Sequence, residues 1–83
     1  MTASAVTIRY FAGAKAAVGT AEETARAGDL AELKAIVTER HGHELERILK
    51  SSTLLVNGLA ARGDDAALSE GDTVEILPPF AGG

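Results

Sequence analysis

In two segments, one near each end of the chain, apolar residues occupy every second position. In the first, Val6, Ile8 and Tyr10 alternate with Thr7, Arg9 and Phe11; in the second, Val74 and Ile76 alternate with Thr73, Glu75 and Leu77. A period of two places the two sets on opposite faces of a strand. The pattern therefore predicts a strand near the start of the chain and another over residues 73–77.

Between these segments, one stretch has the apolar spacing of a helix. Its apolar stripe consists of Leu30, Leu33, Ile36 and Val37. Asp29 is a good N-cap, and Glu32 completes a capping-box-like pair. Arg40 and His41 suit the last turn, and Gly42 is the expected C′ residue. We expect the stripe, Ile36 included, to pack on the inward residues of the strands.

The other elements are predicted from shorter signals. Residues 12–19 are mostly small and end at a glycine, which predicts a connection with one short helical turn. Residues 22–26 are predicted to form a strand, although their β-propensity is weak. Leu45, Ile48 and Leu49 suggest another short helical turn. Asn57-Gly58 is a hairpin signal between strands over residues 54–56 and 59–62.

This order of elements predicts an α+β fold. A mixed sheet of about five strands, covered on one face by one main helix, suits the β-grasp of ubiquitin-like proteins. Pro78 and Pro79 cannot donate to a ladder and end the sheet. We therefore expect one domain over residues 1–77 and a flexible Gly-Gly tail over residues 78–83.

Composition excludes several classes of function. The net charge of −4 argues against nucleic-acid binding, which needs clustered cations. No apolar run approaches a membrane span, and the N-terminus does not resemble a signal peptide, so we expect a cytoplasmic protein without a membrane partner. With no cysteine, the chain can form neither a disulfide nor a persulfide.

Catalytic and metal sites are not apparent within the domain. His41 and His43 flank a glycine without a recognisable carboxylate–histidine constellation, so we expect helix-end cations and no metal site. No Ser–His–Asp arrangement or phosphate-binding loop is visible, and 83 residues leave little room for a substrate pocket. The isolated chain is therefore not expected to be an enzyme or to bind a cofactor.

The tail has a distinctive construction. Pro78-Pro79 stiffens its root, Phe80 is an apolar anchor, and Ala81-Gly82-Gly83 forms a slim tip able to enter a narrow channel. Frayed termini are common, so the Gly-Gly end alone is not decisive. A carboxylate is a poor electrophile and requires activation, typically as an acyl-adenylate made with ATP by another enzyme. Attack by sulfide or persulfide on that adenylate would yield a thiocarboxylate.

The chain resembles a known family over essentially its whole length. The resemblance rests on residues 8–12 (IRYFA), 56–58 (VNG), Leu68 with 70–74 (EGDTV), and 78–83 (PPFAGG). These segments look like the small subunit of molybdopterin synthase. The resemblance implies a β-grasp, a sulfur-bearing carboxyl on Gly83 next to Gly82, and an adenylating partner that uses ATP on Gly83. It also implies tail insertion into a large catalytic subunit and sulfur transfer to cyclic pyranopterin monophosphate.

A partner surface is expected beside the tail. Alternation puts Phe11 and Leu77 on the outer sheet face, near Pro78 and Pro79, with Phe80 and Ala81 continuing the surface along the tail. That one of the two apolar residues belongs to the core remains open.

Three other functions also remain open. A sister sulfur carrier for cysteine or thiamine-thiazole synthesis would use the same terminal chemistry. A ubiquitin-like modifier would join Gly83 to lysines of target proteins. A β-grasp interaction module would have an incidental tail.

Overall fold

The computed structural model describes residues 4–79. Its elements follow the order β1 (Ser4–Tyr10), α1 (Ala12–Val18), β2 (Glu22–Ala27), α2 (Leu30–His41), α3 (His43–Lys50), β3 (Thr53–Val56), β4 (Leu59–Ala60) and β5 (Thr73–Leu77). The strands form one mixed sheet in the order β2-β1-β5-β3-β4. The predicted five-stranded α+β architecture is confirmed.

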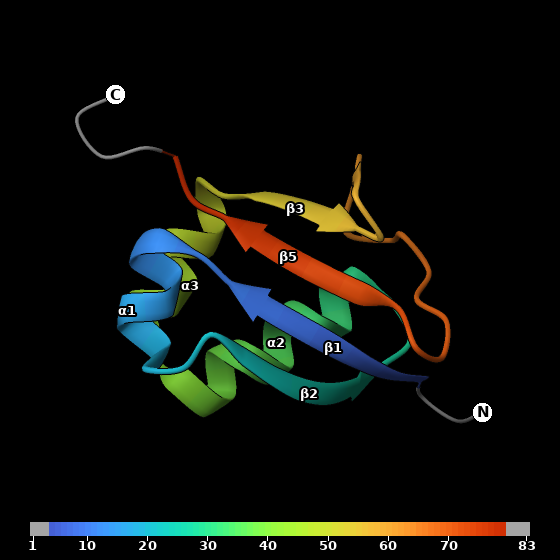
Figure 1. The fold of residues 1–83 in the computed structure, drawn as a ribbon, viewed down its shortest axis with the longest axis horizontal. Helices are drawn as coiled ribbons and strands as arrows, with labels where there is room; N and C mark the ends of the chain where they lie inside the picture. The colour runs from blue at the N-terminus through green and yellow to red at the C-terminus, as the bar shows by residue number, and fades with distance from the viewer. Residues whose placement is uncertain (1–3, 80–83) are drawn as a thin grey trace.

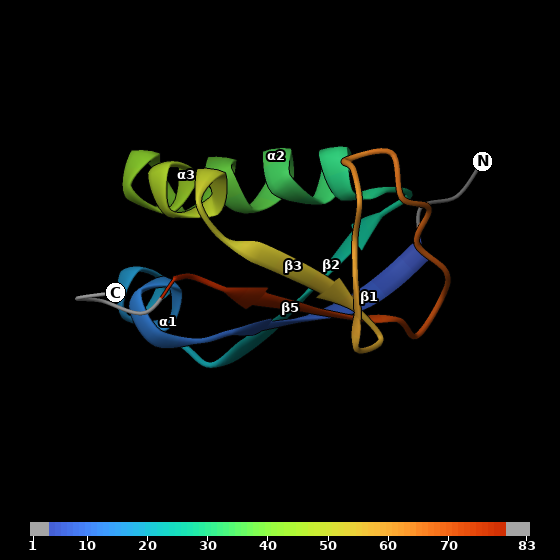
Figure 2. The same ribbon diagram turned by 90° about the horizontal axis from the view of Figure 1, so that it is seen from above.

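The elements form two layers. Figure 2 shows α2 and α3 side by side over one face of the sheet, while α1 lies at one end of the sheet. β5 is the central strand, with β1 parallel to it on one side and β3 on the other (Figure 1). β2 and β4 are the edges of the sheet. The core lies between the sheet and the two helices. Its largest fully buried side chains are Tyr10, Ile8, Leu30, Leu33, Leu45, Ile76, Val6, Val37 and Val74.

The longest helix, α2, begins and ends where the sequence predicts. The Glu32 N–H donates to Asp29 Oδ1 at 2.9 Å, and the Gly28 N–H donates to Glu32 Oε1 at 2.7 Å. The helix ends at Gly42, whose φ of 92° favours glycine and whose N–H donates to the Thr38 carbonyl. Two further N–H groups of the first turn, those of Leu30 and Ala31, donate to the carbonyls of Ala66 and Asp64, so the start of α2 is satisfied by its own cap together with a distant loop.

Two expectations about these elements need correction. Three helices are present in residues 4–79 instead of one main helix, because α1 and α3 each form about two turns around buried anchors (Ala14; Leu45 and Leu49). The strand after the hairpin comprises only Leu59–Ala60, and it is followed by one more hydrogen bond to β3, from the Ala61 N–H to the Leu54 carbonyl. The expected packing of Ile36 is confirmed, since it packs against the core, although it is only half-buried whereas Leu33 and Val37 are fully buried.

The Asn57-Gly58 hairpin also sets the position of β5. Both residues have positive φ, as a type I′ turn requires. The Asn57 side chain donates to Asp72 Oδ1 at 2.9 Å and accepts from the Thr73 N–H at 3.0 Å. Hydrogen bonds from the Ser69 N–H and from Asn57 hold the pKa of the Asp72 carboxyl below its usual range. The β3–β4 turn is thereby tied to the start of β5.

Candidate functional site

The candidate site begins where the two central strands end together. β1 and β5 are parallel, and Arg9 and Tyr10 lie opposite Glu75 and Ile76 in the ladder. Phe11 and Leu77 each follow immediately, at the end of the sheet beside α1 (Figure 1). Pro78 and Pro79 then continue the chain beyond β5. The root of the tail therefore starts next to the end of β1.

One face of the sheet is not covered by α2 and α3, and it carries a line of charges across three strands. Arg9 Nε lies 3.6 Å from Glu22 Oε2 on β2, and Arg9 Nη1 lies 3.7 Å from Glu75 Oε2 on β5. The same guanidinium lies 5.6 Å from the centroid of the Phe11 ring. Exposed ion pairs and an exposed cation–π contact each stabilise a fold only weakly, so these contacts mainly place the Arg9 charge beside the Phe11 ring.

The structure assigns neither predicted apolar contact residue to the core. Phe11, Leu77 and Pro78 are half-buried, and Pro79 is exposed. An apolar surface is thus present at the root of the tail, bordered by Arg9. Its role in partner binding stays a prediction, and the predicted residues Phe80, Ala81, Gly82 and Gly83 lie outside the described residues.

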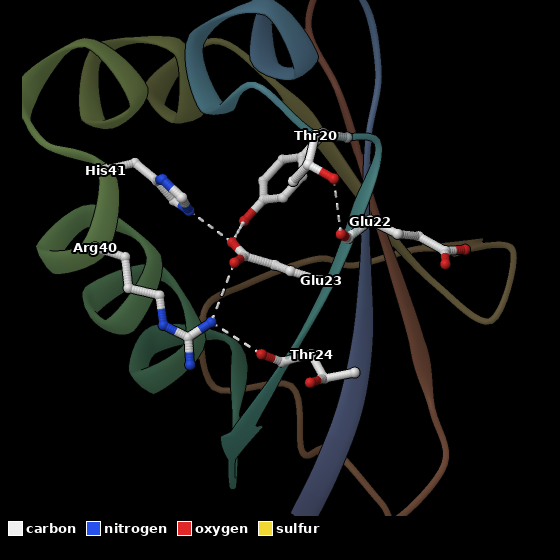
Figure 3. A network of polar contacts seen from close by, with 7 residues as sticks. Thr20, Glu22, Glu23, Thr24, Arg40 and His41 are labelled. Carbon is white, nitrogen blue, oxygen red and sulfur yellow. Dashed lines mark hydrogen bonds and ion pairs between the residues drawn. The ribbon is translucent and has the colours of Figure 1, made fainter.

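A polar cluster lies on the other side of β1, between β2 and the end of α2 (Figure 3). Glu23 points inward from β2, where it accepts a hydrogen bond of 2.5 Å from the Tyr10 hydroxyl. His41 Nε2 lies 2.7 Å from the same carboxylate oxygen. Arg40 Nη1 lies 3.3 Å from the other oxygen and donates to the Thr24 carbonyl at 2.9 Å.

Electrostatics of the cluster favour a charged Glu23 and a neutral Tyr10. Burial opposes ionisation of Glu23, but hydrogen bonds from Tyr10 and His41 and the charges of His41 and Arg40 outweigh it and lower its pKa. Burial first, and then the hydrogen bond and charge of Glu23, raise the pKa of Tyr10. Both carboxylate oxygens are engaged, so the cluster is suited to joining β1, β2 and α2 rather than to proton transfer. It anchors Tyr10, the residue before Phe11.

This cluster corrects one sequence interpretation. His41 does lie in the last turn of α2, as predicted, but each histidine has a carboxylate partner that the sequence did not reveal: His41 bonds Glu23, and His43 lies 3.1 Å from Glu46. One signal in the sequence could have revealed the cluster: Glu23 occupies an inward position of a strand, and a carboxylate there needs a polar partner. Within residues 4–79, no three His, Cys, Asp or Glu side chains gather as a metal site would need. In the same residues, no helix combines the length and apolar character required to cross a membrane.

A model of the ThiS family matches residues 8–83. The chain belongs to the ThiS family. This ThiS-family protein is 33% identical over 82 residues to a molybdopterin synthase sulfur carrier subunit from Chlamydomonas reinhardtii, covering 94% of this chain and 98% of the relative. The resemblance found in the sequence is thereby confirmed.

Two solved structures bear on the fold of this ThiS-family protein. The solution structure of small archaeal modifier protein 1 from Methanosarcina acetivorans matches with a TM-score of 0.87 at 23% identity, covering 98% of each chain. A chain from the complex of subunits 1 and 2 of the molybdopterin-converting factor of Helicobacter pylori matches with a TM-score of 0.73 at 28% identity, covering 95% of this chain and 99% of that one. The β-grasp prediction is confirmed.

Proposed function

We propose that this chain is the sulfur-carrier subunit of a molybdopterin synthase, with a thiocarboxylate at Gly83 that donates sulfur to cyclic pyranopterin monophosphate. The observation that carries the proposal is its 33% identity to a relative named as such a subunit, over nearly the full length of both chains. The sequence adds the required chemical group, since Gly83 ends a Gly-Gly tail and no cysteine offers an alternative sulfur site.

The proposed loading reaction takes place on a partner enzyme. A carboxylate oxygen of Gly83 attacks the α-phosphorus of ATP and pyrophosphate leaves, giving an acyl-adenylate. A sulfide equivalent then adds to the carbonyl carbon and AMP leaves, giving the thiocarboxylate. The chain has no phosphate-binding loop of its own. Its contribution is a carboxyl at the end of a slim tail.

The apolar surface at the root of the tail supports docking to a large catalytic subunit. Phe11, Leu77 and Pro78 are half-buried on a β-grasp domain, and apolar anchors of this kind carry much of the energy of protein interfaces. The Helicobacter pylori relative was solved as a protein–protein complex of subunits 1 and 2. We assign Phe11, Leu77, Pro78, Pro79, Phe80 and Ala81 to the contact with such a subunit.

Intact-mass spectrometry tests the proposal. The purified chain would be incubated with a molybdopterin-synthase adenylating enzyme, ATP and a sulfide source. We expect a mass gain equal to the difference between sulfur and oxygen, located on Gly83 by fragmentation and absent without ATP. A chain extended by one residue after Gly83 is the matched control. Equal loading of the extended chain, without processing back to Gly-Gly, would overturn the proposal.

The other uses of the same carboxyl predict different products. A ubiquitin-like modifier would appear in cell extract as higher-mass conjugates joined through Gly83 to lysines. A sister carrier would load with sulfur but would not convert cyclic pyranopterin monophosphate when mixed with a molybdopterin synthase large subunit. Conversion in that mixture, without conjugates in extract, is the result expected here.

A further inference from the structure

Strand β2 forms one edge of the sheet, and every second residue along it directs its backbone N–H and C=O away from β1. The Thr7 N–H donates to the Asp72 carbonyl and so points toward β5, away from β2. Thr24, opposite Thr7, therefore sits at a non-hydrogen-bonded position of the β1–β2 ladder. Its N–H and C=O face outward, as do those of Glu22 and Arg26, two residues to either side.

Few of these outward groups are occupied within residues 4–79. The Glu22 carbonyl accepts from the Thr20 hydroxyl, and the Thr24 carbonyl accepts from Arg40 (Figure 3). No hydrogen bond involves the outward N–H of Thr24 or either backbone group of Arg26 in that part of the chain. This edge therefore offers a template for one more strand.

A groove of about 500 Å³ follows the same edge. It is lined by Ala5, Thr24, Ala25, Arg26, Ile36 and Arg40. Ile36, the half-buried member of the helix stripe, forms its apolar wall on α2. The incomplete burial of Ile36 thus coincides with an open groove.

The rim of the groove carries positive charge although the chain is acidic overall. Arg26 is exposed and has no ion-pair partner in residues 4–79. The nearby carboxylates have partners: Glu22 pairs with Arg9, and Glu23 bonds Tyr10 and His41. Glu70 accepts from the N–H of Ala5, which lines the groove. An acidic ligand would be favoured at this place and disfavoured over much of the remaining surface.

We propose that this groove binds an extended segment of a partner protein, which adds to β2 as an outer strand and alternates apolar with acidic side chains. The backbone of that segment would pair with the outward groups of Thr24 and Arg26, as in other strand additions. Because side chains alternate across a strand, one set would contact Ile36 and the other would lie beside Arg26. A backbone N–H of the segment would replace Arg40 at the Thr24 carbonyl. This surface is independent of the proposed sulfur chemistry.

Nuclear magnetic resonance of the full chain tests the proposal. The probes are two blocked pentapeptides, one alternating valine with glutamate and one alternating valine with lysine. We expect the glutamate peptide to shift amides of residues 22–26 and 36–40, with a dissociation constant of about 1 mM or tighter. The lysine peptide should bind at least about tenfold more weakly, since it meets Arg26 with like charge.

Two variants and a control make the test specific. Arg26→Glu should reverse the preference between the two peptides, whereas Arg62→Glu, beyond the opposite edge strand β4, should leave it unchanged. Thr24→Pro removes an outward N–H without removing a ladder bond, so the strand should persist while binding falls about tenfold.

Several results would overturn the inference. These are no shifts at about 5 mM of the glutamate peptide, shifts on the open sheet face instead, or an unchanged preference in Arg26→Glu. A concentration-dependent dimer with the same shifts in the absence of peptide would assign the edge to a second copy of the chain. If Thr24→Pro fails to fold by circular dichroism, the Arg26 and Arg62 pair still decides the question.

Discussion

Replacing Tyr10 by phenylalanine removes a single hydroxyl from the buried end of β1. The Tyr10 side chain is 2% exposed, and its hydroxyl donates to the Glu23 carboxylate. Phenylalanine keeps the ring and its packing, so the loss is mainly that of a hydrogen bond to a charged group, about 1.5–3 kcal/mol. Since 1 kcal/mol shifts the melting temperature of a domain of this size by roughly 4–8 °C, we expect a fall of about 10 °C at neutral pH.

The deficit of the Tyr10→Phe variant should depend on pH in a definite direction. Glu23 has a pKa below its usual value of 4.5, because hydrogen bonds and neighbouring cations outweigh the effect of burial. A carboxyl whose pKa is lowered on folding stabilises the fold fully above its unfolded pKa, and that contribution is lost as the pH falls through the folded pKa. The deficit should therefore be full above pH 4.5 and shrink as the pH is lowered further.

Thermal melts followed by circular dichroism across that pH range measure both effects. Ser52→Ala is the matched control, since the Ser52 hydroxyl donates at 2.7 Å to the neutral carbonyl of Ile48. It should cost about 1 kcal/mol, without the acid dependence of the Tyr10 variant. A Tyr10→Phe variant that melts with the wild type at neutral pH, or whose deficit persists unchanged in acid, would refute the assigned role of Glu23.

Three further predictions concern the core, the partner surface and the tail. Leu33→Ala should lower the free energy of unfolding, measured with denaturant, by about 2–5 kcal/mol, and Ile36→Ala by about 1 kcal/mol, because only Leu33 is fully buried. Equal losses in the two variants would contradict the observed burial. Phe11→Glu or Leu77→Glu should weaken binding to a molybdopterin synthase large subunit at least about tenfold by calorimetry with unchanged circular dichroism, and unaltered affinity would remove both residues from the interface. Deletion of Gly83 should abolish sulfur transfer without lowering the melting temperature, so retained transfer would show that another residue holds the sulfur.

The parts of the fold with strong local signals were predictable from the sequence. The Asp29 cap, the alternation around Ile8 and Ile76, and the Asn57-Gly58 turn each depend on a few adjacent residues, and each is present in the structure. Helix α1 was underestimated, because a run of small residues has no apolar stripe that would reveal its length. The end of β4 depends on pairing with β3, which no local pattern contains.

The candidate site was predictable where it follows from alternation and unpredictable where it follows from tertiary contact. The outward face of Phe11 and Leu77 required only the strand period, whereas their meeting at one end of the sheet required the parallel pairing of β1 with β5 that a β-grasp provides. The meeting of Tyr10, Glu23 and His41 requires the register of β1 with β2 and the length of α2 together. A small shift in either would separate the hydroxyl, the carboxylate and the imidazole, so the sequence alone does not reveal the cluster.

The parallel contact of β1 with β5 has a consequence for how the protein matures. The first strand of the chain and the last described strand lie side by side in the middle of the sheet, with β3 reaching β1 only through β5. A nascent chain that lacks residues 73–77 therefore lacks the central strand, and β1–β2 and β3–β4 can form only two separate hairpins. Long-range closure of this kind is slow compared with local helix formation. The surface formed by the ends of β1 and β5 requires this pairing, so a partner that docks there, as proposed above, would discriminate against chains that lack β5.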